Sequence, residues 1–413
     1  MLLHSNLPQK KAVLFSSIER KTFCLDCFRF ILQGFIDVEF KTYVLLIAIR
    51  VFDMSNNTKG ILAAASYVGM ASTPFVLRFF TKVCPLKTNY AISVLLFVVS
   101  IMIGFALFTD RWLIFLIAIV IAKICYKQTL PFVTDIYNQN YPKERRGWII
   151  GKLFTILAIS SIVFVYFCSK LLDKSLSNYR WVLLISALSA FICGCIFLKI
   201  PNGRTLSHDS ESFLRSNLSI LLNDRLFSVV LGLWSLMSIA FQMTFPLRTE
   251  YLANQCYGLN LSNSNITLIT VIIPTIMRIV SSLFWGKIFD TQNFAIMKIM
   301  INLCFLISIP TFFFTRNFTL WILSTVALGL GYGGNLTAWQ LWVTKIVPSP
   351  EKLGAYVSLD IATMGLRDAL SAALGYFLLS HSVSLHTICV LAIVLIGIST
   401  VGFCFLTKNP RLD

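Results

Sequence analysis

The chain has 413 residues, of which 57% are hydrophobic and only 13% are charged. Soluble proteins carry about 25% charged residues, so this composition excludes an ordinary soluble domain. The net charge of +17 does not indicate nucleic-acid binding, because membrane proteins collect Lys and Arg in their cytoplasmic loops. We therefore expect an integral, multi-pass membrane protein that has no nucleic-acid partner.

Apolar stretches long enough to cross a lipid bilayer recur along the whole chain. Backbone polar groups cannot stay unpaired in lipid, so each stretch is predicted to be a helix. Twelve spans are predicted, at residues 28–49, 58–77, 89–108, 112–137, 148–169, 181–199, 226–247, 266–289, 296–314, 318–343, 355–380 and 387–406. The predicted fold class is an all-α polytopic membrane protein with twelve transmembrane helices.

A polar stretch near the middle of the chain divides the spans six and six. The predicted organisation is a cytoplasmic N-terminal segment (1–27), an N-terminal six-helix half (28–200), a cytoplasmic central linker (201–225), a C-terminal six-helix half (226–406) and a cytoplasmic tail (407–413). Lys and Arg are more frequent in the termini and in alternate loops, which places both termini in the cytoplasm. The expected location is the bacterial inner membrane.

Charged residues within the predicted spans point to a functional site, since a charge at mid-bilayer costs roughly 3 to more than 10 kcal/mol. The basic residues within the spans are Arg29, Lys41, Lys123, Lys127, Arg278 and Arg367. Arg29 lies near a helix end, from which its side chain is expected to reach the membrane surface. The other basic residues, Lys59 and Arg248 among them, are assigned to loops or helix ends.

Two lysines in the fourth span, Lys123 and Lys127, are one helical turn apart and form a basic stripe. The planar guanidinium of Arg278 would suit a carboxylate or a phosphate. A charge within the membrane must face a cavity or a partner. Lys41, Lys123, Lys127, Arg278 and Arg367 are therefore interpreted as candidate substrate-binding residues for an organic anion.

Four carboxylates accompany these cations: Asp37, Glu39, Asp360 and Asp368. Asp37 and Asp360 lie one and two helical turns before Lys41 and Arg367, so the two cations could be neutralised within their own helices. Intramembrane carboxylates also relay protons in many transporters. Ion pairing and proton coupling both remain open for the four residues.

The tenth span is rich in glycine and in polar residues. Gly329, Gly331, Gly333 and Gly334 are expected to allow close helix packing. Asn335, Trp339 and Gln340 are candidates for contact with a substrate, and hydrogen bonding within the protein interior is the alternative.

The two halves contain a weak internal repeat, with "YPKERRGWIIGK" after the fourth span and "VPSPEKLGAYVS" after the tenth. The eighth span ends in "GKIFDTQN", in which Gly286 and Asp290 have a Gly-x-x-x-Asp spacing. With these motifs and its six-plus-six spans, the chain resembles the major facilitator superfamily over nearly its whole length. The resemblance implies a secondary transporter with a central cavity, and a gating role for Gly286 and Asp290. In the matching loop of the first half, Arg78 and Lys82 replace the Gly and Asp.

No nucleotide-binding, catalytic or metal-ligating motif is recognised, so we expect no enzyme, no catalytic or metal site and no cofactor. The predicted function is secondary active transport of a small organic solute, expected to be a carboxylated or phosphorylated anion. The partners expected are this substrate, a coupling proton or counter-anion, and the lipid bilayer, with the protein acting as a monomer. Two alternatives stay open: an exporter of lipophilic drugs or metabolites, and a transporter-like sensor that binds its ligand without moving it.

Overall fold

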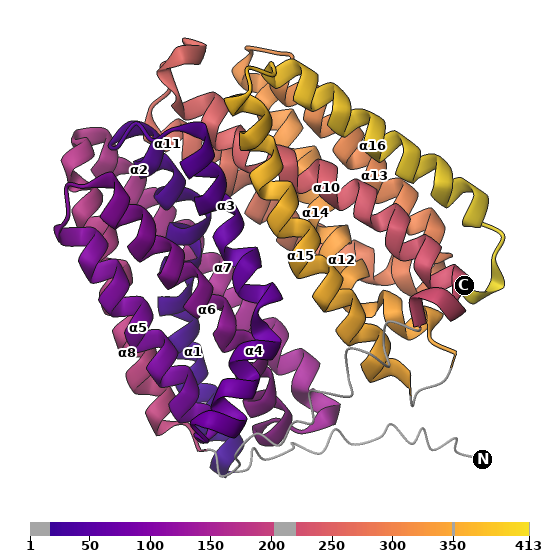
Figure 1. The fold of residues 1–413 in the computed structure, drawn as a ribbon. Helices are drawn as coiled ribbons and strands as arrows, with labels where there is room; N and C mark the ends of the chain where they lie inside the picture. The colour runs from indigo at the N-terminus through magenta and orange to yellow at the C-terminus, as the bar shows by residue number, and fades with distance from the viewer. Residues whose placement is uncertain (1–16, 202–219, 349–351, 413) are drawn as a thin grey trace, which may run out of the picture.

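The computed structural model describes residues 17–201, 220–348 and 352–412, and helices make up nearly all of this part of the chain (Figure 1). Within these residues the helices form twelve spans, which confirms the predicted fold class. Span 1 joins α1 (Ser17–Val38), η1 (Glu39–Tyr43) and α2 (Val44–Arg50), and span 2 joins α3 (Asn56–Ala71), α4 (Thr73–Arg78) and η2 (Phe79–Val83). Spans 3 to 6 are α5 (Thr88–Phe108), α6 (Trp112–Asn140), α7 (Lys143–Lys174) and α8 (Tyr179–Lys199).

The second half repeats this pattern. Span 7 is α10 (Arg225–Ala253), and span 8 joins α11 (Asn263–Thr267), η5 (Leu268–Ile272) and α12 (Ile273–Thr291). Spans 9 to 12 are α13 (Phe294–Phe313), α14 (Phe318–Ile346), α15 (Leu353–Ser380) and α16 (Leu385–Leu406). Three short 3-10 turns complete the described elements: η3 (Leu176–Asn178), η4 (Gln255–Tyr257) and η7 (Pro410–Leu412).

The first helix begins at Ser17, within the segment expected to precede it. Residues 1–16 of that expected segment and residues 202–219 of the expected linker lie outside the described residues. Polar side chains mark several helix starts: the oxygens of Ser55, Asp224 and Ser384 each accept a hydrogen bond from a backbone N–H in the following first turn. Such caps satisfy amide groups that have no partner within the helix.

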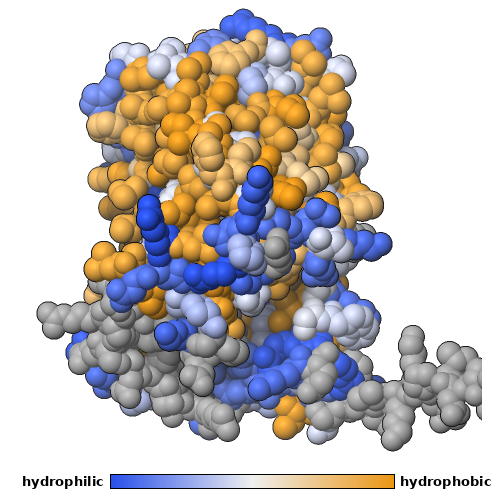
Figure 2. All heavy atoms as spheres, turned by 90° about the vertical axis from the view of Figure 1, so that its right-hand side faces the viewer, coloured by the Kyte–Doolittle hydropathy of each residue, from blue (hydrophilic) through white to orange (hydrophobic). Residues whose placement is uncertain are grey.

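Eight of the described helices are each long and apolar enough to cross a membrane, and they lie in spans 3 to 9 and 12. Spans 1, 2, 10 and 11 carry more charge, glycine or hydrogen-bonding residues in their middle parts. Exposed apolar side chains such as Val394 and Val401 of α16 give the molecule a hydrophobic band, with hydrophilic residues at its two ends (Figure 2). The protein is an integral membrane protein whose less apolar spans need protection from lipid.

The two halves form separate groups of helices in the ribbon, indigo to magenta and red to yellow (Figure 1). Within the first half, α5 packs on α6 and α8, and α1 packs on α7; within the second, α14 packs on α12 and α13. The principal contact between the halves joins α3 to α15. A Cβ atom at Gly365 of α15 would lie 2.9 Å from the backbone nitrogen of Ala71, so glycine is needed for this close approach.

Glycine also brings α14 and α12 together, as expected from the tenth span. A Cβ atom at Gly329 would come within 2.7 Å of the Pro274 carbonyl oxygen, and one at Gly333 within 2.9 Å of the Arg278 carbonyl oxygen. The close-packing interpretation of these glycines is confirmed. The tight contact places Asn335 and Trp339, further along α14, toward the centre of the molecule.

Candidate functional site

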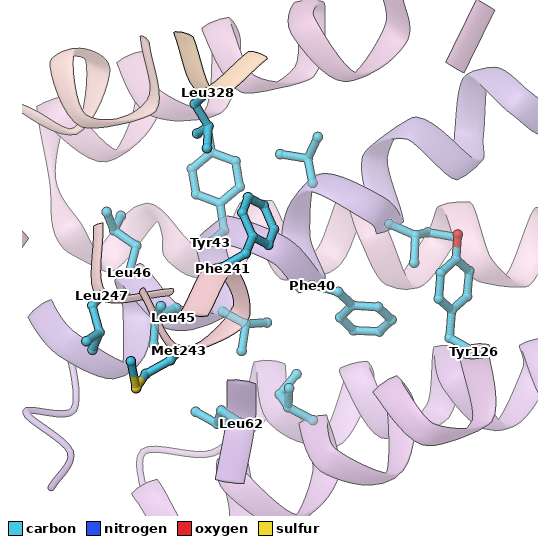
Figure 3. Close-up of a cluster of buried hydrophobic side chains, with 14 of the residues drawn as sticks. Phe40, Tyr43, Leu45, Leu46, Leu62, Tyr126, Phe241, Met243, Leu247 and Leu328 are labelled. Carbon is cyan, nitrogen blue, oxygen red and sulfur yellow. The ribbon is translucent and has the colours of Figure 1, made fainter. Parts of the chain in front are cut away.

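A cavity of about 360 Å³ lies between the two halves. Spans 1, 2 and 4 line it from the first half, and spans 7, 8, 10 and 11 from the second. The less apolar spans noted above all face this cavity. Aromatic side chains form much of its wall, including Phe40, Tyr126 and Phe241, which are seen among the buried side chains in Figure 3. The cavity is therefore charged and aromatic at once.

Most residues predicted for the site do reach the cavity. Those that line it are Asp37, Lys41, Lys123, Lys127, Asn335, Trp339, Asp360, Arg367 and Asp368. Glu39 and Arg278 are not among the lining residues. The side chain of Gln340 lies outside what the structure describes.

In the first half, Asp37 is the centre of a small polar cluster. Its Oδ1 accepts a hydrogen bond of 2.6 Å from the Tyr126 hydroxyl, and its Oδ2 lies 3.7 Å from the Lys41 ammonium. The Lys41 side chain is 52% exposed. Lys127 lies one turn of α6 beyond Lys123, and no carboxylate of the described residues is within ion-pair distance of its ammonium. Lys127 therefore has no carboxylate partner among the described residues, and its ammonium is available to a negatively charged ligand in the cavity.

The two lysines of the predicted basic stripe differ in their surroundings. Lys123 is only 5% exposed, and its ammonium donates a 2.6 Å hydrogen bond to the carbonyl oxygen of Leu62 on α3. Lys127 is half-buried and lies with its ammonium 5.7 Å from the centre of the Tyr126 ring. Lys123 thus ties two helices together, whereas Lys127 keeps its hydrogen-bonding capacity toward the cavity.

In the second half, Arg367 is paired with its neighbour in sequence. Its Nε lies 2.9 Å from Asp368 Oδ1, and a second nitrogen donates to the Ser235 hydroxyl at 3.2 Å. Asp368 also accepts hydrogen bonds from Ser238 and from Gln242. The guanidinium is therefore already neutralised by the adjacent carboxylate.

This network extends across the interface between the halves. The Tyr67 hydroxyl of α3 donates to Gln242 Oε1 of α10 at 2.9 Å, and Gln242 in turn donates to Asp368 of α15. A movement of α3 away from α10 would break the first of these bonds. The carboxylate of Asp368 is thus linked to the relative position of the two halves.

Asp360 lies deeper in the second half and is 6% exposed. Its Oδ2 accepts a hydrogen bond from the Trp342 indole nitrogen at 3.3 Å. Trp342 packs in turn against Trp234, with ring centres 5.5 Å apart, and Trp234 lines the cavity. Asp360 thus lines the cavity beside an aromatic pair, of which Trp234 also forms part of the wall.

Two buried cations had been assigned to a helix end or a loop from the sequence. Lys298 of α13 is fully buried, with its ammonium 3.7 Å from the centre of the Trp234 ring and 3.1 Å from Asn335 Oδ1. Arg248 of α10 is 2% exposed, lines the cavity and donates to the Ser308 hydroxyl at 2.8 Å. The sequence prediction placed Arg248 just beyond span 7 and Lys298 near the start of span 9, and it considered each span without its neighbouring helices. Both residues were therefore missed as buried cations.

The snorkelling interpretation of Arg29 is wrong. Its guanidinium is buried and donates to Asp26 at 2.8 Å, to Gln33 at 2.5 Å and to the Tyr137 hydroxyl at 2.5 Å. Because α1 continues back to Ser17, Arg29 lies well inside the helix rather than at its end. Two partners on the same helix and one on α6 hold it within the protein.

Arg278 and the predicted loop motif lie away from the cavity lining. Arg278 of α12 is half-buried, with its guanidinium 5.5 Å from the centre of the Tyr332 ring, and Tyr332 itself lines the cavity. Gly286 and Asp290 lie in the last turns of α12, where Asp290 is exposed. Arg278 therefore lies beside a lining residue, Tyr332, and is not itself part of the lining.

At one end of the interface, named here the Arg50 end, polar contacts join the halves. The Lys59 ammonium of α3 lies 2.6 Å from Glu250 Oε1 of α10, and both side chains are buried. Tyr376 of α15 donates to the same carboxylate at 3.3 Å. Arg50 donates to Asn263 Oδ1 at 2.6 Å and to a neighbouring backbone carbonyl. Lys59 had been assigned to a loop, and its partner lies in the other half of the chain.

Further contacts close the same end. The Asp173 carboxylate at the end of α7 accepts hydrogen bonds from the backbone nitrogens of Asn263 and Ser264, at 2.6 and 3.2 Å. The halves lie close together here and diverge toward the opposite end, where α1 begins (Figure 1). The cavity is therefore sealed at the Arg50 end by contacts between the two halves.

Comparison with known proteins gives the family. The sequence profile of the Major Facilitator Superfamily matches residues 23–348, while no curated protein shows significant similarity. The fold is similar to that of the nucleoside transporter NupG, with 12% identity over 95% of this chain and 100% of that chain and a TM-score of 0.73. It is also similar to a D-xylose-proton symporter (12% identity, 95% and 98% covered, TM-score 0.68).

A third similar structure is a bacterial homolog of the human lysosomal transporter Spinster, in an inward-facing and occupied conformation. It has 14% identity over 96% of this chain and 99% of that chain, with a TM-score of 0.66. At such identities the structures support the fold alone, and the sequence profile supplies the family. Since that profile matches more than half of the chain, the protein belongs to the major facilitator superfamily.

Proposed function

We propose that the protein is a secondary transporter of a small organic anion, carboxylated or phosphorylated, that works by alternating access. The observation that carries this proposal is the position of Lys127 in the cavity between the halves, with no carboxylate of the described residues at ion-pair distance. An unpaired cation within a membrane is costly. A bound anion would offset that cost and gain a charge-assisted hydrogen bond.

The balance of charge in the cavity supports the same substrate class. Lining cations outnumber lining carboxylates: Lys41, Lys123, Lys127, Arg248 and Arg367 face Asp37, Asp360 and Asp368. The Arg367–Asp368 pair is closed at 2.9 Å, whereas the Asp37–Lys41 pair is loose at 3.7 Å. The excess positive charge is therefore concentrated in the first half. Asn335 and Trp339 would contact the rest of the substrate from the second half.

The similar structures include a nucleoside transporter and a xylose symporter, whose named substrates are neutral. A nucleoside and xylose therefore serve as neutral controls for the proposed anionic substrate. Purified protein in proteoliposomes would be tested by counterflow with carboxylated and phosphorylated metabolites, and with a nucleoside and xylose as neutral probes. We expect counterflow with a member of the anionic set. Transport of the neutral probes alone would overturn the anionic assignment but not the transport function.

The aromatic wall of the cavity favours a second candidate, which is export of lipophilic compounds. An apolar surface for a flat or lipophilic molecule is provided by Phe40, Tyr126, Phe241, Phe245 and Trp234. A lipophilic dye added to the same proteoliposomes would test this function. Transport of the dye that does not change in the Lys127→Gln variant would favour export of lipophilic compounds over anion transport.

The proposed topology places both termini and the linker 201–225 in the cytoplasm of a bacterial cell, between halves 28–200 and 226–406. The Arg50 end would then face outward, and the sealed end of the cavity would be the external one. Reporters fused after Pro201 and after Leu412 should read cytoplasmic, and one after Gly258 should read external. Two reporters on the opposite side would refute this orientation.

A further inference from the structure

Lys298 of α13 is a buried basic residue that does not reach the cavity, although both of its partners do. Its side chain is 0% exposed, and no carboxylate of the described residues lies within ion-pair distance of its ammonium. The ammonium lies 3.7 Å from the centre of the Trp234 ring and 3.1 Å from Asn335 Oδ1. Trp234 and Asn335 line the cavity, whereas Lys298 is not among the lining residues. Lys298 is therefore placed behind the cavity wall.

The two contacts of Lys298 hold its side chain in one position. A basic group buried without an opposite charge is costly, so it keeps every favourable contact that the interior offers. An indole ring attracts a cation that lies over its face within about 6 Å, and the amide oxygen of Asn335 accepts a hydrogen bond. Loss of either contact would leave the amine less well compensated. The geometry at Trp234 and Asn335 is therefore maintained from behind by one buried amine.

The contact with Lys298 also fixes which way the Asn335 amide points. An asparagine amide has an acceptor, Oδ1, and a donor group, Nδ2, while an ammonium group has donors alone. Because the contact is with Oδ1, the lysine is the donor whatever its charge. Turning the amide over would place Nδ2 donors against the lysine donors. Lys298 therefore keeps Oδ1 toward itself and leaves Nδ2 on the other side of the amide.

The Nδ2 group of Asn335 remains available to a ligand. Asn335 is half-buried on the cavity wall, and no acceptor of the described residues is bonded to its Nδ2. Gln242, the other amide side chain that lines the cavity, differs in this respect. Its Oε1 accepts from Tyr67 and its Nε2 donates to Asp368. Of these two amides, Asn335 alone has a donor that is not already engaged within the described residues.

We propose that Lys298 is a positioning residue that makes Asn335 a hydrogen-bond donor to the substrate, so that Asn335 selects a carboxylate, phosphate or carbonyl oxygen. The substrate would carry one anionic group for Lys127 of span 4 and a second oxygen acceptor for Asn335 of span 10. An amino group at the second position would face the Nδ2 donors and be rejected. The choice of substrate rests on the proposed function, but the orientation of the amide does not.

Thermal unfolding of purified variants tests the orientation without any substrate. Asn335→Asp keeps the shape of the side chain and places a carboxylate beside Lys298, so the unfolding temperature should rise. Asn89→Asp is the matched control. Asn89 is 4% exposed and donates to the Ile200 carbonyl oxygen at 3.4 Å, so a carboxylate there should lower the unfolding temperature. A decrease in both variants would overturn the contact assigned to Lys298.

Uptake into proteoliposomes tests the donor. For a substrate found by counterflow, Asn335→Asp should reduce uptake about ten- to hundred-fold, because an acceptor replaces the Nδ2 donor. Stability and uptake would then change in opposite directions, which a purely structural role of Asn335 would not produce. Uptake at the wild-type rate in Asn335→Asp would overturn the donor role, whereas transport of other substrates by the wild type would leave the transport function intact.

Competition with a matched pair of compounds tests the positioning by Lys298. Glutarate and γ-aminobutyrate share one carboxylate and a chain of methylene groups, and differ in a second carboxylate or an ammonium group. Glutarate should inhibit wild-type uptake more strongly. The preference should shrink in Lys298→Met, because the released amide is then free to turn Oδ1 toward the cavity. A preference that is unchanged in Lys298→Met would refute the positioning role.

Failure of the proposed function gives a different result from failure of this inference. Wild-type protein that shows no counterflow with any probe would refute transport. The unfolding temperatures of Asn335→Asp and Asn89→Asp would still decide whether Lys298 holds the amide oxygen. Counterflow by the wild type together with normal uptake by Asn335→Asp would refute only the selection by Asn335.

Discussion

Two ion pairs in the same inter-half interface have opposite surroundings. Lys59 and Glu250 at the Arg50 end are 2.6 Å apart, with side chains 4% and 1% exposed. Asp37 and Lys41 in the cavity are 3.7 Å apart, with side chains 15% and 52% exposed. The first pair joins residues of different halves, and the second joins residues one turn apart in span 1.

This difference separates charges that hold the structure from charges that can meet a ligand. A buried pair loses its hydration, so removing one partner leaves an uncompensated charge. A half-exposed pair keeps much of its hydration and contributes little to stability. We infer that the Arg50 end is held closed in this state by buried partners, whereas Lys41 and Lys127 in the cavity have a distant carboxylate partner or, among the described residues, none.

The largest effect is expected at the Arg50 end. Lys59→Met should destabilise the protein by about 3–5 kcal/mol, because it leaves Glu250 buried without its cation. The additional change Glu250→Gln should recover much of this loss, since both charges are then removed. Thermal unfolding of the single and double variants in detergent would measure the coupling.

A matched control for this pair is available on the surface. Arg180 and Asp110 lie 2.6 Å apart, but their side chains are 50% and 81% exposed. Arg180→Met should leave the unfolding temperature unchanged. The comparison fails if Arg180→Met is as destabilising as Lys59→Met, or if Glu250→Gln gives no recovery.

The next effect concerns the two lysines of α6. Lys127→Gln should reduce uptake of the transported anion about ten- to hundred-fold, which corresponds to the roughly 1.5–3 kcal/mol of a hydrogen bond to a charged group. Its unfolding temperature should stay near that of the wild type. Lys123→Gln should lower the unfolding temperature instead, because it removes the hydrogen bond to the Leu62 carbonyl.

Uptake kinetics and thermal unfolding of these two variants would be measured side by side. Equal effects of Lys123→Gln and Lys127→Gln on both quantities would contradict the different roles assigned to them. An unchanged uptake rate in Lys127→Gln would remove the main support for an anionic substrate.

A smaller effect is expected at the end opposite Arg50. Burial raises the pKa of Asp224, but hydrogen bonds from Arg411, the Phe227 amide and Tyr356 outweigh it, so its pKa lies below the ordinary 3.8. A lowered carboxylate pKa adds stability above the unfolded-state pKa, and this is lost as the pH falls through the folded-state value. Arg411→Met should thus cost about 0.5–1 kcal/mol near neutral pH.

The Arg411→Met variant also tests the predicted direction of the pH dependence of stability. The stability difference between wild type and Arg411→Met should shrink as the pH falls below about 4. Thermal unfolding over a pH series would follow it. A difference that grows toward acid pH would show that another contact of Arg411, such as its bond to the Ile346 carbonyl, dominates.

The smallest effect on stability is expected for the Asp37–Lys41 pair in the cavity. Lys41→Met should change the free energy of unfolding by only about 0–0.5 kcal/mol, because the ammonium is half exposed. Asp37 keeps its hydrogen bond from Tyr126 in this variant. A loss as large as that in Lys59→Met would show that Lys41 is a structural cation, and that the two pairs do not differ as proposed.

Much of the fold followed from the sequence alone, because a bilayer imposes a fixed thickness and forbids unpaired backbone groups. The twelve spans agree with the described helices, and the charges within spans 1, 4 and 11 led to residues of the cavity. The same rule placed the start of α1 too late in the sequence, because the first turns of this helix are too polar to be predicted as part of a membrane span. Arg29 was consequently placed at a helix end.

Only the tertiary structure decided which charges have partners. Lys59 and Glu250 are 191 residues apart in the chain, and the Leu62 carbonyl that engages Lys123 belongs to another helix. Lys298 needs Trp234 and Asn335 from two other spans. Sequence periodicity describes the faces of one helix, and it therefore finds pairs such as Asp37 and Lys41. The environment of a charge depends on which helices pack around it, and that is decided by side-chain contacts between segments far apart in the chain.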